Sequence, residues 1–156
     1  MPLGAFLLLV AAAAATGARF TPGPWYEALD RPPLAPPDWI FGPVWTALYV
    51  AIAVAAFLVW RRRSEHRIGL ALGLWTTQLG LNALWSYLFF GLERPGLALV
   101  DILVLLAAVL ATAAAFRPIS RPAAILFVPY AAWVGFATYL NAGFWWLNRG
   151  GPGGVP

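Results

Sequence analysis

The chain has 156 residues, of which 62% are hydrophobic and only 10% are charged. A soluble domain usually carries about 25% charged residues, so this chain has too few charges to cover a surface that faces water. Its length suits one domain, and that domain must face lipid. The absence of cysteine excludes disulfides, thiolate metal sites and a cysteine nucleophile. We therefore expect a single integral membrane domain.

The net charge of +4 comes from ten arginines and no lysine. The arginines stand at the ends of apolar segments rather than in one patch, so they indicate membrane topology and not a nucleic-acid surface. The only histidine is His66, in a basic loop, and the only methionine is Met1. A buried haem normally takes an axial His, Cys, Met or Tyr. We therefore expect no haem, no other cofactor and no metal site.

Five apolar stretches are long enough, or nearly so, to cross a bilayer, which takes roughly 20 residues. They cover residues 3–20, 40–61, 68–90, 96–116 and 122–147. The pattern predicts an all-α membrane bundle of five transmembrane helices, followed by a flexible Gly/Pro-rich tail over residues 148–156.

The first stretch permits a second interpretation, because an apolar run that ends in Ala-rich sequence can be a cleaved signal peptide. Met1–Phe6 contains no Lys or Arg. The positive region that begins such a peptide is therefore missing, which favours a retained helix.

Arginine placement predicts the orientation. With five helices, the N-terminus shares a side with the second and fourth loops, and that side carries six arginines against four on the other. Because inner loops carry the excess of positive charge, we expect the N-terminus on the inner side.

Residues 21–39 separate the first two apolar stretches, and half of the 14 prolines lie between positions 22 and 43. This segment is too polar to span a membrane and too rich in proline for one helix. Pro24–Leu29 can form one turn, and the rest is predicted to be extended and stiff. Because Tyr26 and Trp39 are aromatic, we expect the segment to form a lid on the mouth of the bundle.

The third stretch has two different faces. At 100° per residue, small side chains share one side, which includes Gly69, Gly73 and Gly80. Such a stripe allows helices to approach closely in lipid, and we expect a homodimer to form there. The opposite side carries the aromatic and amide residues Trp75, Gln78, Asn82, Trp85 and Phe89. An amide facing lipid would leave its hydrogen bonds unmet, so this side is predicted to turn inward.

Tryptophans inside the apolar stretches indicate a ligand cavity. An aromatic belt explains tryptophans at helix ends, but Trp45, Trp85 and Trp133 are internal. Tyr49 follows Trp45 by one helical turn, and Ala137 leaves room beside Trp133. Counting 1.5 Å per residue places Trp45 about 8 Å below the loop side and Trp133 nearer mid-membrane. We therefore expect Trp45 at the mouth of the cavity and Trp133 at its floor.

Asp101 is the only charged residue in the interior of a predicted span, away from its ends. Helix geometry places Asp101 and Asn82 roughly 8–12 Å from the same membrane side, so a hydrogen bond between them is feasible. Asp101 either ties two helices together or tunes a polar spot within the cavity, and the sequence leaves both readings open.

Several of these residues occur together at a spacing that is specific to one family. They are Trp25, Tyr26, Leu29, Arg31, Pro32, Pro36, Pro37, Trp39, Phe41, Trp45, Tyr49, Asn82, Trp85, Asp101, Pro129, Tyr130, Trp133, Ala137 and Thr138. On these residues the chain resembles the translocator protein/tryptophan-rich sensory protein (TspO/MBR) family from end to end.

The resemblance implies a five-helix bundle that dimerises and binds porphyrins, including protoporphyrin IX, as well as hydrophobic drugs. Some members bind cholesterol, transport and stress sensing have been proposed, and some bacterial members promote light-dependent breakdown of protoporphyrin. By position, Trp45 and Trp133 match the tryptophans tied to that breakdown. The positions that match the pocket are Tyr26, Tyr49, Asn82, Trp85 and Ala137.

Two departures from the family matter. Many relatives have an additional Trp where this chain has Leu34, so the lid is less aromatic. The proposed cholesterol pattern in the fifth helix needs a basic residue within about five residues after its tyrosine. After Tyr139 the next arginine is Arg149, so that motif is incomplete.

Three functional hypotheses follow. The first is binding of a porphyrin or similar flat ligand, with aromatic stacking on the macrocycle, Asn82 at its polar edge and Arg31 offsetting a propionate at the mouth. The second is light- and oxygen-dependent breakdown of porphyrin, with Trp45 and Trp133 as the reactive indoles, since no acid–base pair supports ordinary catalysis. The third is a structural or regulatory partner protein.

Overall fold

The computed structural model describes residues 2–64 and 67–150, and within them every regular element is helical. The elements are α1 (Leu3–Ala18), α2 (Pro24–Glu27), the 3-10 turn η1 (Asp38–Ile40), α3 (Phe41–Arg61), α4 (Gly69–Ser86), the π-helical turn η2 (Tyr87–Gly91), α5 (Pro95–Phe116) and α6 (Arg121–Asn148). The predicted all-α class is therefore confirmed for the described residues.

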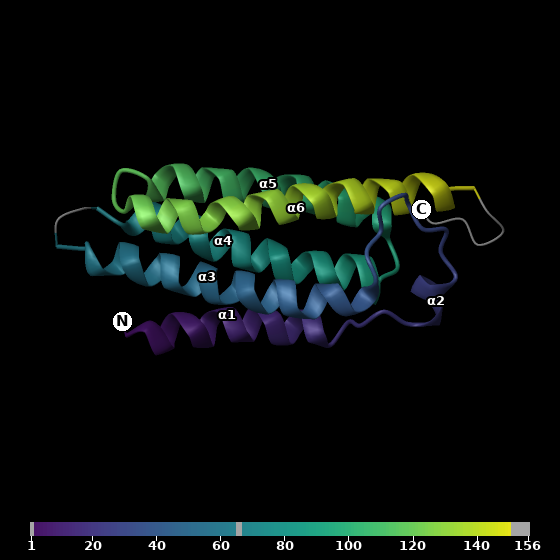
Figure 1. Ribbon diagram of the computed structural model, residues 1–156, viewed down its shortest axis with the longest axis horizontal. Helices are drawn as coiled ribbons and strands as arrows, with labels where there is room; N and C mark the ends of the chain where they lie inside the picture. The colour runs from purple at the N-terminus through teal and green to yellow at the C-terminus, as the bar shows by residue number, and fades with distance from the viewer. Residues whose placement is uncertain (1, 65–66, 151–156) are drawn as a thin grey trace.

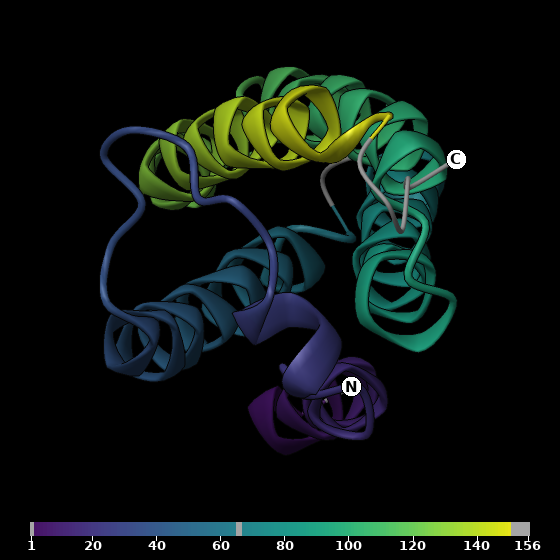
Figure 2. The ribbon, with the colours of Figure 1, turned by 90° about the vertical axis from the view of Figure 1, so that its right-hand side faces the viewer.

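The longer helices run side by side along the molecule (Figure 1). Contacts join α1 to α3 and α4, α3 to α6, α4 to α5, and α5 to α6, so the five helices close into a ring, as the end-on view in Figure 2 shows. The segment between α1 and α3 crosses one end of this ring, here called the lid end. The α5–α6 turn lies at the other end, here called the far end.

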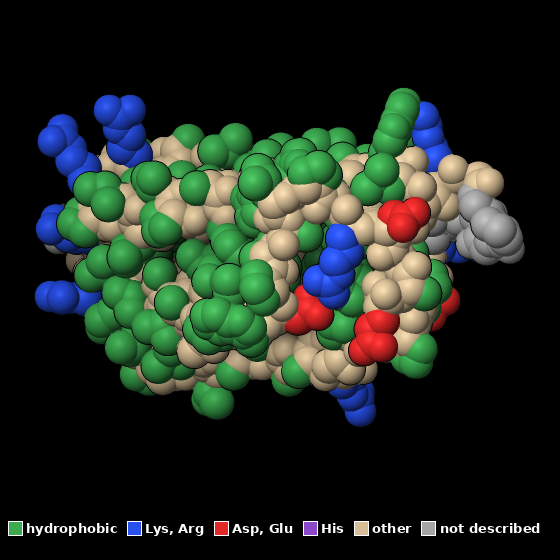
Figure 3. Space-filling view, turned by 45° about the vertical axis from the view of Figure 1, so that its right-hand side comes forward, with side chains coloured by type: hydrophobic (Ala, Val, Ile, Leu, Met, Phe, Trp, Pro, Cys, Tyr) green, Lys and Arg blue, Asp and Glu red, His purple; other side chains and the backbone are tan. Residues whose placement is uncertain are grey.

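Length and composition suit a membrane. Three helical stretches are long and apolar enough to cross one, namely Asp38–Arg61, α5 and α6. The remaining two are α1, which is apolar but has 16 residues, and α4, which contains two amide side chains, Gln78 and Asn82. The outer surface is largely apolar (Figure 3), and Leu8 and Leu70 are 73% and 76% exposed on it. Such side chains are stable facing lipid, as the composition predicts.

The end of the third apolar stretch differs from expectation. A single α-helix over 68–90 is wrong for its last turn, because α4 ends at Ser86 and continues as the π-helical turn Tyr87–Gly91. The wider turn is closed by a hydrogen bond of 2.8 Å from the Leu92 N–H to the Tyr87 carbonyl. The hydrogen bond spans one residue more than in an α-helix, and Phe89 in this turn is buried in a cluster with Tyr26 of α2. Single π-turns of this kind are frequent at functional sites.

Other helix ends lie within two residues of the expected positions. α1 stops at Ala18 and α6 extends to Asn148, which the expected tail over 148–156 had included. Ser120 is the N-cap that precedes α6, and its side chain accepts a hydrogen bond from the Ala123 N–H. His66 and residues 151–156 lie outside the described residues.

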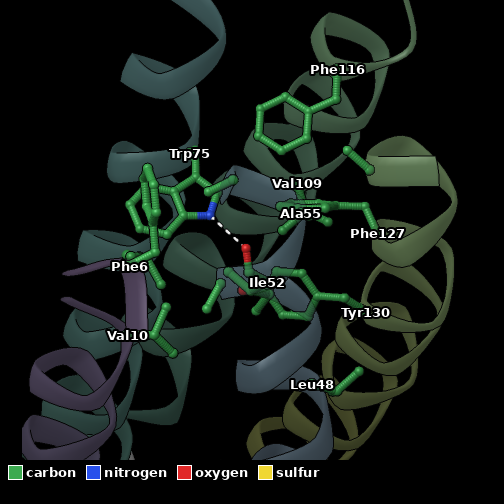
Figure 4. Close-up of a cluster of buried hydrophobic side chains, with 14 of the residues drawn as sticks. Phe6, Val10, Leu48, Ile52, Ala55, Trp75, Val109, Phe116, Phe127 and Tyr130 are labelled. Carbon is green, nitrogen blue, oxygen red and sulfur yellow. Dashed lines mark hydrogen bonds between the residues drawn. The ribbon is translucent and has the colours of Figure 1, made fainter. Parts of the chain in front are cut away.

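A cluster of buried hydrophobic side chains packs between the helices (Figure 4). Trp75 is buried there, with its indole N–H donating to the Ile52 carbonyl at 3.1 Å and its ring edge-on to Phe6 at 5.5 Å. α4 therefore turns its aromatic and amide face inward, as predicted. Trp75, however, packs in the core and does not line the cavity.

Candidate ligand-binding cavity

An internal cavity of about 460 Å³ lies at the lid end of the bundle. It receives side chains from the α1–α3 segment, α1, α3, α4, η2, α5 and α6, so every wall comes from a different part of the sequence. The structure brings seven of the eight predicted ligand-binding residues to this cavity. These are Tyr26, Trp45, Tyr49, Asn82, Trp85, Trp133 and Ala137.

Trp39 is the eighth, and its predicted place in the cavity is wrong. It stands on the 3-10 turn Asp38–Ile40, and its side chain is 74% exposed. In a turn with three residues per turn, side chains three positions apart point the same way. Asp38 and Phe41 are three apart and both line the cavity, whereas Trp39, between them, points outward. An exposed Trp at a helix end is typical of the aromatic belt at a membrane surface.

Trp45 and Trp133 both line the cavity, but their expected order of depth is wrong. Trp133 lies edge-on to Phe41, the first residue of α3, with ring centroids 5.7 Å apart. Trp45, one turn further along α3, contacts Tyr130 at 6.2 Å, one turn earlier on α6. α6 is 28 residues long and reaches beyond the start of α3 at the lid end. Counting residues from the start of α6 therefore placed Trp133 too deep. Trp133 does not lie beneath Trp45 at the bottom of the cavity.

A chain of hydrogen bonds forms the polar side of the cavity. The Tyr49 hydroxyl donates to Asn82 Oδ1 at 2.8 Å, and Asn82 Nδ2 donates to the Tyr130 hydroxyl at 3.3 Å. The Tyr130 hydroxyl in turn donates to Gln78 Oε1 at 2.8 Å. Three helices, α3, α4 and α6, are joined this way. Because the polar atoms of Asn82 are already paired, the network fixes the cavity wall rather than leaving an amide free.

A second polar contact fixes the cavity wall beside α5. The indole N–H of Trp85 donates to Asn141 Oδ1 at 2.8 Å, and Asn141 Nδ2 donates to the Pro95 carbonyl at 2.8 Å. That carbonyl belongs to the first turn of α5. Trp85 also stacks on Phe89 of η2, with ring centroids 5.2 Å apart. The ring of Trp85 is thus held in one orientation, which suits a surface on which a flat ligand stacks.

Asp101 is buried but does not join these networks. The feasible hydrogen bond to Asn82 is not formed, because Asn82 bonds to Tyr49 and Tyr130 instead. Among the described residues, Asp101 Oδ2 has no hydrogen-bond partner, and Asp101 does not line the cavity. The reading in which Asp101 tunes the cavity directly is therefore not supported by its position.

Aromatic packing seats the α1–α3 segment on the bundle. Tyr26 of α2 is buried, and its ring lies 6.2 Å from Phe89, 5.4 Å from Phe90 and 5.4 Å from Phe144. Burial raises the pKa of Tyr26, and the charge of Asp38 raises it further while that of Arg31 lowers it. Since a phenol ordinarily titrates near pH 10, Tyr26 is neutral at physiological pH.

Polar contacts tie the same segment to α6. Asn148 Oδ1 accepts from the Asp30 N–H at 2.9 Å, and Asn148 Nδ2 donates to the Asp30 carbonyl at 3.1 Å. The Tyr139 hydroxyl donates to the Pro33 carbonyl at 2.9 Å. These contacts hold the segment across the cavity end of the bundle (Figure 2).

Arg31 stands at the mouth of the cavity. It forms an ion pair of 3.0 Å with Asp38, which itself lines the cavity, and its guanidinium lies 5.2 Å from the centre of the Tyr26 ring. Both charged side chains are more than a third exposed, so this pair contributes little to stability. The ion pair thus places one positive group beside a residue that lines the cavity.

The glycine face of α4 is open. A Cβ built on Gly69, Gly73 or Gly80 meets nothing within 4 Å. These glycines therefore do not serve helix packing within the chain, and all three lie on the outer surface.

Sequence reasoning missed the contribution of α1. Ala14, Gly17 and Ala18 line the cavity, and Gly17 is so close to α4 that a Cβ there would lie 3.2 Å from the Ser86 hydroxyl. Small residues three and four apart were the available signal, because they mark a helix face that others approach closely. It also missed Phe144, whose place depends on the π-turn opposite it.

Among the described residues, no group of three or more His, Asp or Glu side chains is placed to hold a metal ion. The site is thus a mostly apolar, aromatic cavity with a few paired polar groups.

The apolar outer surface, the membrane-length helices and the aromatic cavity define an α-helical integral membrane protein with an internal cavity. A profile of the TspO/MBR family matches residues 5–147, so the chain belongs to that family. It is 40% identical to the translocator protein of Homo sapiens, over 99% of this chain and 94% of the relative. It is 42% identical to the tryptophan-rich protein TspO of Chlorobaculum tepidum, over 85% and 86%. It is 40% identical to the tryptophan-rich sensory protein of Cereibacter sphaeroides, over 87% and 84%.

Proposed function

We propose that the protein binds a porphyrin such as protoporphyrin IX, or a similar flat hydrophobic ligand, in the cavity beneath the α1–α3 segment. The observation that carries this proposal is the convergence of Trp45, Trp85 and Trp133 on one cavity of about 460 Å³. Cavities of some 300–1,000 Å³ with apolar walls and few polar groups suit small-molecule ligands. Binding of this kind can serve transport or sensing.

The cavity chemistry favours a flat aromatic ligand over a polar one. Ring faces stack on a macrocycle at about 0.5–1.5 kcal/mol for each aromatic pair, and Trp85 is already oriented by Asn141. Arg31 at the mouth can approach a propionate, because an exposed ion pair such as Arg31–Asp38 exchanges partners at small cost.

Quenching of tryptophan fluorescence by protoporphyrin IX, measured in detergent and in the dark, tests this function. We expect saturable quenching that a flat hydrophobic competitor reverses. Quenching that rises linearly with porphyrin concentration, as it does for a non-specific absorber, would refute the proposal and favour a structural or regulatory role.

A second candidate function is light- and oxygen-dependent breakdown of the bound porphyrin, with molecular oxygen as the oxidant. It is favoured by the position of Trp45 and Trp133, both of which line the cavity, with the Tyr49 ring 5.3 Å from Trp45. Trp45→Phe and Trp133→Phe keep an aromatic surface and remove the indole.

If indole chemistry drives breakdown, each of these two variants loses nearly all product under light, while porphyrin affinity falls by less than about tenfold. Product is measured by absorbance and mass spectrometry, with dark samples as the control. Wild-type product yields from both variants would rule out breakdown by these indoles and leave porphyrin binding as the function.

We propose that the α1–α3 segment acts as a lid that limits ligand exchange. The two hydrogen bonds between Asp30 and Asn148 hold it to α6. Asn148→Ala removes both, and at about 0.5–1.5 kcal/mol for each bond we expect ligand release to become roughly fivefold faster or more in stopped-flow measurements. Thr77→Ala removes a hydrogen bond within α4, far from the lid, and is the control. Equal rates for both variants would place ligand exchange elsewhere, for example between helices.

We also propose a homodimer through the open glycine face of α4. A Cβ at Gly73 meets nothing in its own chain. Gly73→Leu should therefore weaken dimer formation without disturbing the fold of the monomer. We expect the dimer fraction in crosslinking or size analysis to drop severalfold, with porphyrin binding retained. Gly4→Leu is the matched control, because Gly4 is also outward-facing with nothing within 4 Å of its Cβ. An unchanged dimer fraction in Gly73→Leu would rule out this face.

We propose that α1, α3, α4, α5 and α6 all span the membrane, with the N-terminus on the inner side. The closed ring of contacts supports five spans, since each helix packs on two others. The chain has no cysteine, so single cysteines at Pro2 and Arg149 can report the sides directly by labelling with impermeant reagents. Labelling of both positions from one side would contradict an odd number of spans.

A further inference from the structure

We propose that the far end of the bundle holds a binding site for the headgroup of an anionic phospholipid. A hollow of about 910 Å³ lies there, between the end of α3, the end of α5 and the start of α6. These helix ends lie at the far end of the bundle (Figure 1), and the hollow shares no lining residue with the cavity at the lid end. The site is therefore independent of the function proposed above.

Arginines from three elements converge on the hollow. Arg61 comes from α3, Arg117 follows α5, and Arg121 begins α6, and all three are exposed. Arg62, which follows Arg61, also lines the hollow. The lining includes no acidic side chain. Within residues 2–64 and 67–150, Arg61, Arg117 and Arg121 form no ion pair. Arginines that only set membrane topology need to lie on one side of the membrane and nothing more. Here the tertiary structure also brings them together around one concave surface.

Guanidinium chemistry defines what the hollow recognises. The planar guanidinium fork of arginine matches the oxygens of a phosphate, with two parallel N–H···O bonds. Three guanidinium groups around one hollow carry more positive charge than one phosphodiester carries negative charge. They therefore favour a lipid with a net negative headgroup over one whose phosphate is balanced by its own ammonium group. A phosphatidylglycerol-type lipid therefore fits better than a zwitterionic one.

Apolar residues in and near the hollow argue for a lipid rather than a soluble anion. Its walls include the apolar side chains of Leu58, Ala114 and Pro122. One turn away from the hollow, Leu110 on α5 and Ile125 on α6 are 54% and 65% exposed on the outer surface. Acyl chains can follow this apolar surface while the phosphate meets the arginines, as in other basic pockets at helix ends in membranes. Arginine side chains at this end are visible in blue in Figure 3.

Native mass spectrometry of the full chain in detergent, with phosphatidylglycerol and phosphatidylcholine of identical acyl chains added together, tests the proposal. The test variant is Arg117→Gln/Arg121→Gln. The matched control is Arg63→Gln/Arg67→Gln, which removes the same charge near the same end from residues that do not line the hollow. Circular dichroism melts establish that each variant is folded.

We expect the wild type and the control to retain phosphatidylglycerol over phosphatidylcholine, and the test variant to lose about 20-fold in that preference. An equal loss in both variants would show a diffuse attraction and overturn the site. Equal retention of the two lipids by the wild type would overturn recognition of headgroup charge. Inorganic phosphate at millimolar concentration that displaces the lipid completely would assign the hollow to a soluble anion instead.

Discussion

Ala137→Phe is expected to weaken binding of protoporphyrin IX by about 10- to 100-fold. Ala137 lies on α6 one turn beyond Trp133, and both line the cavity. A phenyl ring at this position occupies space that a ligand needs, so binding must displace the ring or separate the helices. Overpacking of this kind costs about 1–3 kcal/mol, and each 1.4 kcal/mol is a factor of ten in affinity. Fluorescence titration in detergent measures the change.

Ala132→Phe is the control for this prediction. It places the same ring on the same helix, but Ala132 is exposed on the outer surface and does not line the cavity. We expect wild-type affinity from it and an unchanged melting temperature for both variants. If Ala137→Phe bound porphyrin as tightly as the wild type, the ligand would lie outside this cavity.

Asn82→Leu is expected to lower the free energy of unfolding by about 1–2 kcal/mol. Asn82 joins α3 to α6 through Tyr49 and Tyr130, and the substitution leaves the Tyr49 hydroxyl without its acceptor. Loss of one partner costs about 1–3 kcal/mol in a buried site, and less where the membrane-embedded unfolded state finds other partners. Denaturation in mixed detergent micelles, followed by circular dichroism, measures the difference.

A double-mutant cycle separates the hydrogen bond from packing. Tyr49→Phe alone leaves Asn82 Oδ1 unpaired, so it should also destabilise the protein. Tyr49→Phe/Asn82→Leu removes both polar partners and should cost clearly less than the sum of the two single changes. Strict additivity would show that the contact has no coupling energy. Thr76→Val, whose hydroxyl bonds only within α4, should stay within about 0.5 kcal/mol of the wild type.

The sequence by itself determined the helical class, the lipid-facing surface and the inward face of α4. These follow from composition and periodicity, because a bilayer admits few ways to satisfy backbone hydrogen bonds. Spacing between residues was also enough to indicate the family. Seven of the eight expected ligand-binding residues line one cavity. Periodicity kept the pairs Trp45 and Tyr49, Asn82 and Trp85, and Trp133 and Ala137 each on one face of its helix.

The features that depend on how the helices pack against one another were determined only by the tertiary structure. The relative depth of Trp45 and Trp133 follows from the offset between α3 and α6, which counting along one helix does not contain. The outward position of Trp39 follows from a three-residue turn that the proline-rich pattern did not specify. The pairing of Asn82 with two tyrosines, rather than with Asp101, was settled by which hydroxyls the neighbouring helices bring within reach. Periodicity gives the direction of a side chain about its own helix, and partners come from the packing of one helix against another.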